Sequence, residues 1–107
     1  MKLVELVKHL KSVEEAERFV SRELANVELY GVGIYMKDNL DIDSDVKLFD
    51  EELLSGYIKI ESNGIQYENL LPFNMAQEMV EAYMNLEGQM TDLEIAKALL
   101  SYSINDA

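Results

Sequence analysis

YIKIESNGIQYENL, residues 57–70, is the stretch that decides the fold. Its centre, Asn63-Gly64, supplies the two positive φ angles of a type I′ turn, the tightest connection between antiparallel strands. A two-residue turn also sets the register of the strands, in which Ser62 faces Ile65, Ile60 faces Tyr67 and Lys59 faces Glu68. This register gathers the apolar side chains on one face and puts the Lys59–Glu68 pair on the other. The stretch therefore predicts a hairpin with strands over 57–61 and 66–70.

Further strands are predicted before the hairpin. Residues 30–36 alternate, with Tyr30, Val32, Ile34 and Met36 on one face and Gly31, Gly33 and Tyr35 on the other. The two glycines indicate a close approach by another element or a bulge. Residues 38–45 are polar and read as a loop. A short strand is expected over 46–49, and a helical turn over 50–54.

Four helices flank these strands in the sequence. Apolar residues at helical spacing predict a first helix over 2–11. A capping box of Ser12 and Glu15 starts a second helix that ends near Asn26. After Pro72, a box of Asn74 and Gln77 starts a third helix, closed by Gly88. A box of Thr91 and Glu94 starts a fourth, which runs to about Ser103.

The order of elements predicts an α+β fold in one domain, residues 1–107. We expect a small antiparallel sheet of three to four strands, arranged as a meander that contains the Asn63-Gly64 hairpin. Two N-terminal and two C-terminal helices would cover it. The length suits a single domain with one core, and no Pro- or Gly-rich linker divides the chain.

The composition restricts the cellular location and the kinds of chemistry that are expected for the protein. The 107 residues include no cysteine, which removes disulfides, thiol nucleophiles and cysteine-based metal sites. This fits a reducing, cytoplasmic location. Charges interrupt the apolar residues of the N-terminus, so no secretion signal is expected, and no stretch is apolar enough to span a membrane.

Charge is the strongest compositional feature, with 21 acidic and 9 basic residues and a net charge of −12. Residues 1–22 carry five basic against four acidic residues, and residues 23–107 carry four basic against 17 acidic residues. Such a surface repels phosphate backbones, so direct binding of nucleic acid is not expected. It attracts basic proteins. The plain alternative is that the acidity only keeps the chain soluble.

Seven acids in fifteen residues form the densest charge cluster, offset within the stretch by Lys47. The cluster comprises Asp38, Asp41, Asp43, Asp45, Asp50, Glu51 and Glu52. We expect the acidic loop 38–52 to be the docking edge of a non-catalytic binding protein with a basic protein partner. Immunity proteins, antitoxins and other inhibitors that cap basic active sites use the same logic, which is an analogy of function.

A calcium-dependent module is an alternative interpretation of the same loop. Asp41, Asp43, Asp45 and Glu52 occupy positions 1, 3, 5 and 12 of a twelve-residue calcium loop. However, position 6 is Val46 where the sharp turn requires glycine, and a strand instead of a helix enters the loop. The sequence therefore assigns no metal ligands and no cofactor.

Two further readings concern the third helix and catalysis. Met75, Met79, Met84 and Met90 lie in or near that helix with Tyr83, which fits core filling first and a homodimer surface second. The one histidine, His9, is expected on the polar side of the first helix among lysines, where a general base is not favoured. No nucleophile motif or phosphate loop is present, and no carboxylate pair is singled out by its spacing, so an enzyme is not predicted.

Overall fold

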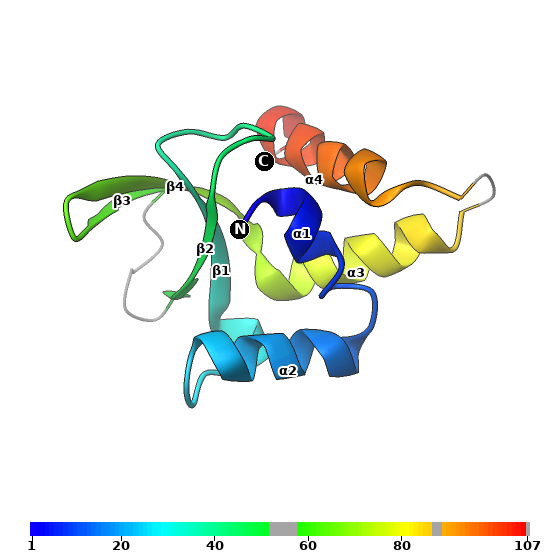
Figure 1. The fold of residues 1–107 in the computed structure, drawn as a ribbon, viewed down its shortest axis with the longest axis horizontal. Coiled ribbons are helices and arrows are strands. Elements are labelled where there is room, and N and C mark those ends of the chain that lie inside the picture. The colour runs from blue at the N-terminus through cyan, green and yellow to red at the C-terminus, as the bar shows by residue number, and fades with distance from the viewer. Residues whose placement is uncertain (52–57, 87–88, 107) are drawn as a thin grey trace.

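The computed structural model describes residues 1–51, 58–86 and 89–106 (Figure 1). The helices are α1 (Leu3–Val7), α2 (Val13–Glu23), α3 (Phe73–Met84) and α4 (Asp92–Asp106), with a 3-10 turn η1 (Leu29–Gly31). The strands are β1 (Val32–Lys37), β2 (Val46–Asp50), β3 (Lys59–Ser62) and β4 (Ile65–Pro72).

The four strands form one antiparallel sheet in the order β2-β1-β4-β3. This confirms the α+β class, but the strand order is not that of a simple meander, because β1 lies between β2 and β4. Burial explains the difference. Five of the six β1 residues are buried, whereas the edge strands β2 and β3 keep exposed positions. A strand that is apolar on both faces is stable only at the centre of a sheet.

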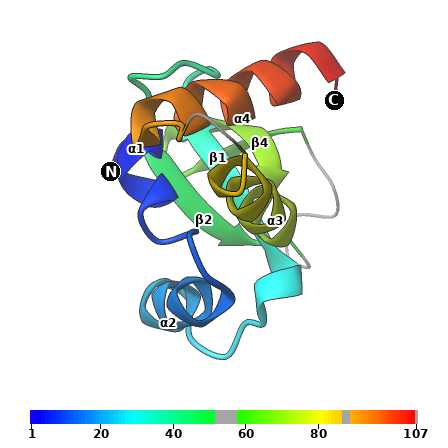
Figure 2. The same ribbon diagram turned by 90° about the vertical axis from the view of Figure 1, so that its right-hand side faces the viewer.

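The helices lie on one side of the sheet, as the two views show (Figures 1 and 2). The core between the two layers takes Leu3, Leu6 and Leu10 from the N-terminus, Ile34 and Met36 from β1, and Phe73, Ala76, Ile95 and Leu99 from the C-terminal helices. A polar contact joins the two layers, in which the Ser103 hydroxyl of α4 donates to the Leu70 carbonyl oxygen of β4 at 2.6 Å. Among the helices, Lys11 pairs with Asp92 at the start of α4, at 2.8 Å.

The hairpin has the predicted register. Ser62 faces Ile65, Ile60 faces Tyr67 and Lys59 faces Glu68. Asn63 and Gly64 have φ angles of 53° and 79°, as a type I′ turn requires. The predicted strand before the turn starts too early, because Ile58 lies outside β3 and is exposed.

Two of the three predicted capping boxes mark the start of a helix. Ser12 Oγ accepts the Glu15 N–H at 3.2 Å at the start of α2. Thr91 and Glu94 bond each other's backbone N–H groups, at 2.9 and 3.1 Å. The box of Asn74 and Gln77 is wrong, because α3 already begins at Phe73, directly after Pro72. Gln77 is instead buried, and its amide donates to the Leu10 carbonyl oxygen and to Glu81.

Most predicted helix ends differ from the observed ones by a few residues. The helix α1 ends at Val7 instead of residue 11, and α2 ends at Glu23 instead of Asn26. The helix α4 continues to Asp106, past Ser103. The predicted helical turn over 50–54 lies mostly outside the described residues, as does Gly88.

Candidate functional site

The seven predicted partner-binding acids lie in two separate places. Asp38, Asp41, Asp43 and Asp45 belong to the loop that joins β1 to β2. Asp50 and Glu51 come at the far end of β2, and Glu52 lies outside the described residues. At about 3.3 Å per strand residue, some 16 Å separate Asp45 from Asp50. The structure therefore does not bring these acids together on one edge, and whether they bind a partner stays a prediction.

Several loop aspartates hold the loop itself. Asp38 has a φ angle of 67°, a left-handed conformation that aspartate and asparagine tolerate. Its N–H donates to the Gln66 carbonyl oxygen at 2.7 Å. Asp41 Oδ1 accepts the Asp43 N–H at 3.0 Å, which is an Asx turn. These residues therefore have structural roles that asparagine would preserve without the charge.

The N-terminus of the chain partly neutralises the loop. Lys2 Nζ lies 3.3 Å from Asp45 Oδ1 and also donates to the Asp43 carbonyl oxygen, while the terminal ammonium lies 3.7 Å from Asp45. The hydrogen bond and charge of Lys2, followed by the terminal ammonium, hold the pKa of Asp45 below its ordinary value of 3.8. The loop is therefore less negative than its sequence indicates.

The loop does not have the form of a twelve-residue calcium site. Val46, at the position where the calcium loop turns sharply, is the first residue of β2. Across residues 1–51, 58–86 and 89–106, no three acidic or histidine side chains are grouped so that they could hold a metal ion.

The second acidic place centres on Glu51, on the sheet near Gly33. The Tyr35 hydroxyl donates to Glu51 Oε2 at 3.2 Å, and the Asn69 amide donates to Oε1 at 3.4 Å. Burial raises the pKa of the Tyr35 hydroxyl, a hydrogen bond with Asn69 acts in the opposite direction, and the Glu51 carboxylate raises it further. The hydrogen bonds from Tyr35 and Asn69 thus hold the Glu51 carboxylate against the sheet.

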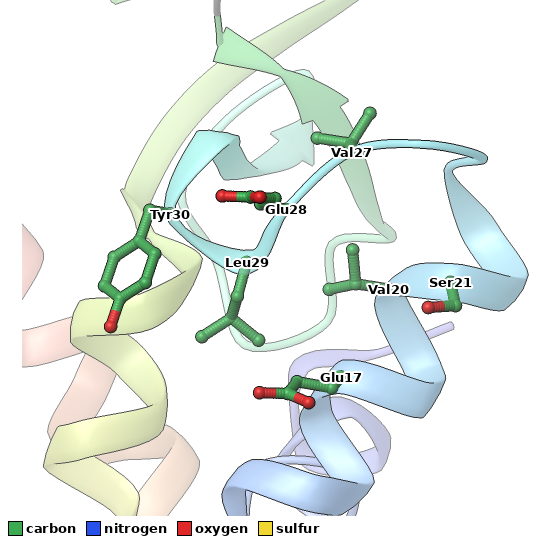
Figure 3. Close-up of a pocket in the computed structure, with 7 residues that line it drawn as sticks. All are labelled: Glu17, Val20, Ser21, Val27, Glu28, Leu29 and Tyr30. Carbon is green, nitrogen blue, oxygen red and sulfur yellow. The ribbon is translucent and has the colours of Figure 1, made fainter.

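A hollow of about 360 Å³ lies between α2 and η1 (Figure 3). Val20 and Leu29 line its apolar part, Glu17 stands on the α2 side, and Glu28 and Tyr30 come from the η1 side. An adjoining hollow of about 430 Å³ shares Val27, Glu28 and Tyr30 with the first and adds Asn26, Gly31 and Asp50. Val27, Glu28 and Tyr30 therefore border both hollows.

This surface, here the Tyr30 surface (Glu17, Glu28, Tyr30 and Asp50 with the apolar lining of Val20, Val27 and Leu29), combines an exposed aromatic side chain with two exposed glutamates, Glu17 and Glu28. Tyr30 is 77% exposed. The lining of the two hollows, as far as the described chain forms it, has no basic side chain. An exposed tyrosine beside hollows that combine apolar and acidic side chains is typical of protein-binding surfaces.

The arginines of α2 are held away from the Tyr30 surface. Arg18 donates to Glu15 at 2.9 Å, and the Arg22 guanidinium lies 5.8 Å above the Phe19 ring. At 100° per residue, Arg18 lies about 100° from Glu17 around the helix axis, and Arg22 lies about 140° from Glu17. The helix therefore presents a carboxylate to the hollow and keeps its positive charges on another side.

His9 is half-buried, and not the exposed surface residue that the sequence suggested. Its ring stacks on Phe19 at 4.4 Å between centroids, and Nδ1 lies 3.0 Å from Glu15 Oε1. Because α1 ends at Val7, the following turns carry His9 onto α2. The hydrogen bonds to His9 and Arg18 hold the pKa of Glu15 below its ordinary value of 4.5. These contacts are those of a residue that joins two segments.

Much of the methionine-rich face of α3 packs against the core. Met75, Met79 and Tyr83 are partly buried against it, as is Met90 beyond the helix. Met84 is 44% exposed. This supports core filling as the main role of the methionines.

Comparisons with models of known protein families, with curated proteins and with solved structures gave no match. In the parts of the chain that the structure describes, no helix joins the length and the apolar composition that a membrane crossing requires. The fold is that of a small α+β domain with an antiparallel sheet. Its function is therefore inferred from the surfaces of the chain itself.

Three residues of the Tyr30 surface were missed by sequence reasoning. Tyr30 was assigned to the apolar face of a strand, but β1 begins two residues later, at Val32. Glu17 and Glu28 look like ordinary exposed glutamates in the sequence. No spacing signal links them to Asp50, because three separate elements bring them together.

Proposed function

We propose that this chain is a non-catalytic, cytoplasmic binding protein that neutralises a basic protein partner, in the manner of an inhibitor or immunity protein. The observation that carries the proposal is the Tyr30 surface, where an exposed tyrosine borders two hollows and the exposed carboxylates of Glu17 and Glu28 belong to their lining. The tyrosine would be the apolar anchor, and the carboxylates would meet lysine or arginine side chains of the partner. The loop acids Asp38, Asp41, Asp43 and Asp45 lie at the other end of the molecule, where Lys2 and the terminal ammonium partly neutralise them, and they are not part of this contact.

Charge and geometry support this choice of partner. The chain carries 12 net negative charges, so a basic protein is steered toward it and nucleic acid is repelled. At the Tyr30 surface, the exposed carboxylates of Glu17 and Glu28 have no basic side chain beside them among the described lining residues. A partner that uses its basic site to hold nucleic acid would lose access to that substrate when this surface covers it.

The experiment is capture of partners from a lysate of the source cells by the immobilised full-length chain, washed at low and at high salt. Two matched double variants locate the contact: Glu17→Gln with Glu28→Gln, and Asp41→Asn with Asp43→Asn. Each removes two exposed charges, and asparagine retains the Asx turn of the loop. Tyr30→Ala tests the anchor, with an expected loss of roughly tenfold or more in affinity.

We expect a basic protein that the wild type retains at low salt and releases at high salt. The Glu17/Glu28 variant and Tyr30→Ala should lose it, while the Asp41/Asp43 variant should largely keep it. The purified partner should also lose its bound nucleic acid when the chain is added. Retention that is independent of salt, equal retention by all variants, or a wild-type capture without any basic protein would each refute the proposal.

A further inference from the structure

A second groove lies between the β1–β2 loop and α4, at the opposite end of the molecule from α2 and η1 (Figures 1 and 2). Its volume is about 440 Å³. The loop contributes Leu40, Asp41 and Ile42 to one wall, and α4 contributes Lys97, Leu100, Ser101, Ile104 and Asn105 to the other. The groove is therefore mainly apolar, with one acid and one base on facing walls.

The helix α4 is apolar on two sides. Ile95, Ala96, Leu99 and Ser103 are buried on the core side. Leu93 and Ile104, by contrast, are 45% and 56% exposed. An apolar stripe on the solvent side of a helix at the edge of a domain is the signature of a surface that another element covers.

The outer side of α4 has the spacing of helix–helix packing. Leu93, Lys97, Leu100 and Ile104 are separated by four, three and four residues, which is the a/d pattern of a heptad. Three of them are exposed, and Leu100 is partly buried against the core. These side chains fall within about 60° of one another around the helix axis. A single lysine in such a stripe is a feature that sets the register of paired helices. The stripe thus fits a second helix, aligned along α4.

Charge at this end of the molecule favours a second copy over a basic partner. Asp38, Asp41, Asp43 and Asp45 of the loop share their two hollows with Lys2, Lys37 and Lys97, and the terminal ammonium lies beside Asp45. Four negative groups thus meet four positive ones, in contrast to the Tyr30 surface. A surface whose charges balance, with one acid and one base on opposite walls of an apolar groove, is complementary to the same surface of a second copy.

We infer that two copies of this chain pair through α4, antiparallel about a two-fold axis, each helix lying in the groove of the other copy. Leu93 of one chain then lies near Ile104 of the second, and Leu100 lies near the middle with the small Ser101. Lys97 of each chain reaches Asp41 of the other, so the charge pair occurs twice. The Tyr30 surfaces remain open at the two far ends of the dimer.

The experiment is the mass of the full-length chain in solution, by light scattering or sedimentation, over a concentration series up to about 1 mM. At that concentration, a dimer with a Kd of about 1 mM would hold about half of the chains. We expect the mass to rise from 12.2 kDa toward twice that value. Ile104→Glu, at an exposed position that the fold tolerates, should keep the mass at that of one chain.

Charge exchange and a control variant make the assignment specific. Asp41→Lys and Lys97→Glu alone should each weaken the dimer several-fold, and the double variant, which restores both the pair and the net charge, should recover it. Met84→Glu, at an exposed apolar position of α3, should leave the mass of the wild type unchanged. A monomer at every concentration, a dimer that survives Ile104→Glu, or one that Met84→Glu dissociates would overturn the inference. Partner capture by the Tyr30 surface is scored separately, with different variants.

Discussion

Gly33, which has no side chain, leaves room for the carboxylate of Glu51. The Glu51 carboxylate lies over Gly33, in space that the side chain of any other residue would take. From there it accepts hydrogen bonds from Tyr35 and Asn69. The pairing of β1 with β4 also shifts register between Ile34 and Tyr35. The sequence suggested a close approach or a bulge at Gly31 and Gly33. The close approach occurs at Gly33 and the register shift directly after Ile34, whereas Gly31 belongs to η1 and has no such close contact.

A methyl group should be tolerated at Gly31 but not at Gly33. An alanine at Gly33 would collide with the Glu51 carboxylate and come within 2.8 Å of Tyr35 Cε1, and Tyr35 is buried. At Gly31 the nearest atom, Val27 Cγ1, would be 3.6 Å away, an ordinary contact. Urea unfolding should show that Gly33→Ala lowers the free energy of unfolding by about 1–3 kcal/mol. Gly31→Ala should change it by less than about 0.5 kcal/mol, and an equal loss in both variants would contradict this account.

Helix starts depend on both the local signal and the packing of the residues around it. The Thr91–Glu94 box forms at an exposed threonine directly before α4, where each side chain accepts the backbone N–H of the other residue. The residues of the expected Asn74–Gln77 box have other positions. Pro72 already has the φ angle of −58° that its ring imposes, and the buried Phe73 anchors the first turn of α3. Gln77 is drawn inward to the Leu10 carbonyl oxygen.

The Thr91–Glu94 box should make the stability of α4 depend on pH. Hydrogen bonds from the Thr91 backbone and side chain hold the pKa of Glu94 below its ordinary value of 4.5. A lowered pKa in the folded state means that the carboxylate stabilises the fold above that value and loses this effect as the pH falls. Glu94→Gln should therefore lower the urea midpoint at about pH 7, and the difference from wild type should shrink toward about pH 3.

Two controls separate the cap from general effects of charge. Thr91→Ala should cost about 1 kcal/mol at neutral pH, because it leaves the Glu94 N–H without its cap. Glu78→Gln, at an exposed position on α3, removes the same charge outside a capping box and should have little effect at either pH. A difference between Glu94→Gln and wild type that stays constant with pH would show that the carboxylate of Glu94 does not act through its charge.

At the scale of the whole molecule, the two ends of the fold differ in their balance of charge, although the chain as a whole is acidic. The N-terminal residues return to the start of β2, where Val46 N–H donates to the Met1 carbonyl oxygen and Lys2 bridges to Asp45. This brings positive charge to the loop 38–45. At the other end, the exposed Glu17 and Glu28 lie near Tyr30 with no basic lining residue among those described. The two ends therefore differ in their balance of charge, and for this reason we propose a different partner for each.

The net charge of −12 should make the fold more stable in salt. Like charges repel one another in the compact state, and salt screens them over about 10 Å at 0.1 M. The melting temperature should rise between about 10 mM and 0.5 M NaCl. Magnesium and calcium chloride at equal concentrations should raise it by the same amount. A rise with calcium alone would instead support the calcium-dependent alternative, and a melting temperature insensitive to salt would show that repulsion is unimportant here.

Local signals predicted the hairpin and two helix starts because each depends on a few neighbouring residues. Asn63-Gly64 imposes its turn wherever the flanking strands can pair. The Ser12 and Thr91 caps satisfy N–H groups within one turn of the helix. The alternation of Val32, Ile34 and Met36 likewise indicated a buried strand. The acidic cluster is visible in the sequence. Its division into two groups is not, because it depends on the strand β2, which separates Asp45 from Asp50.

The sequence by itself determined the class of the fold, the hairpin register, the starts of α2 and α4 and the sign of the net charge. Turns, caps and hairpin register depend on neighbouring residues, and the net charge is the sum of the charged residues. The sequence alone is therefore enough to determine them. Only the tertiary structure decided the order β2-β1-β4-β3, the place of His9 against Phe19, and the meeting of Glu17, Glu28, Tyr30 and Asp50. Contacts between distant segments depend on how the buried faces pack together, which no stretch of the chain specifies alone.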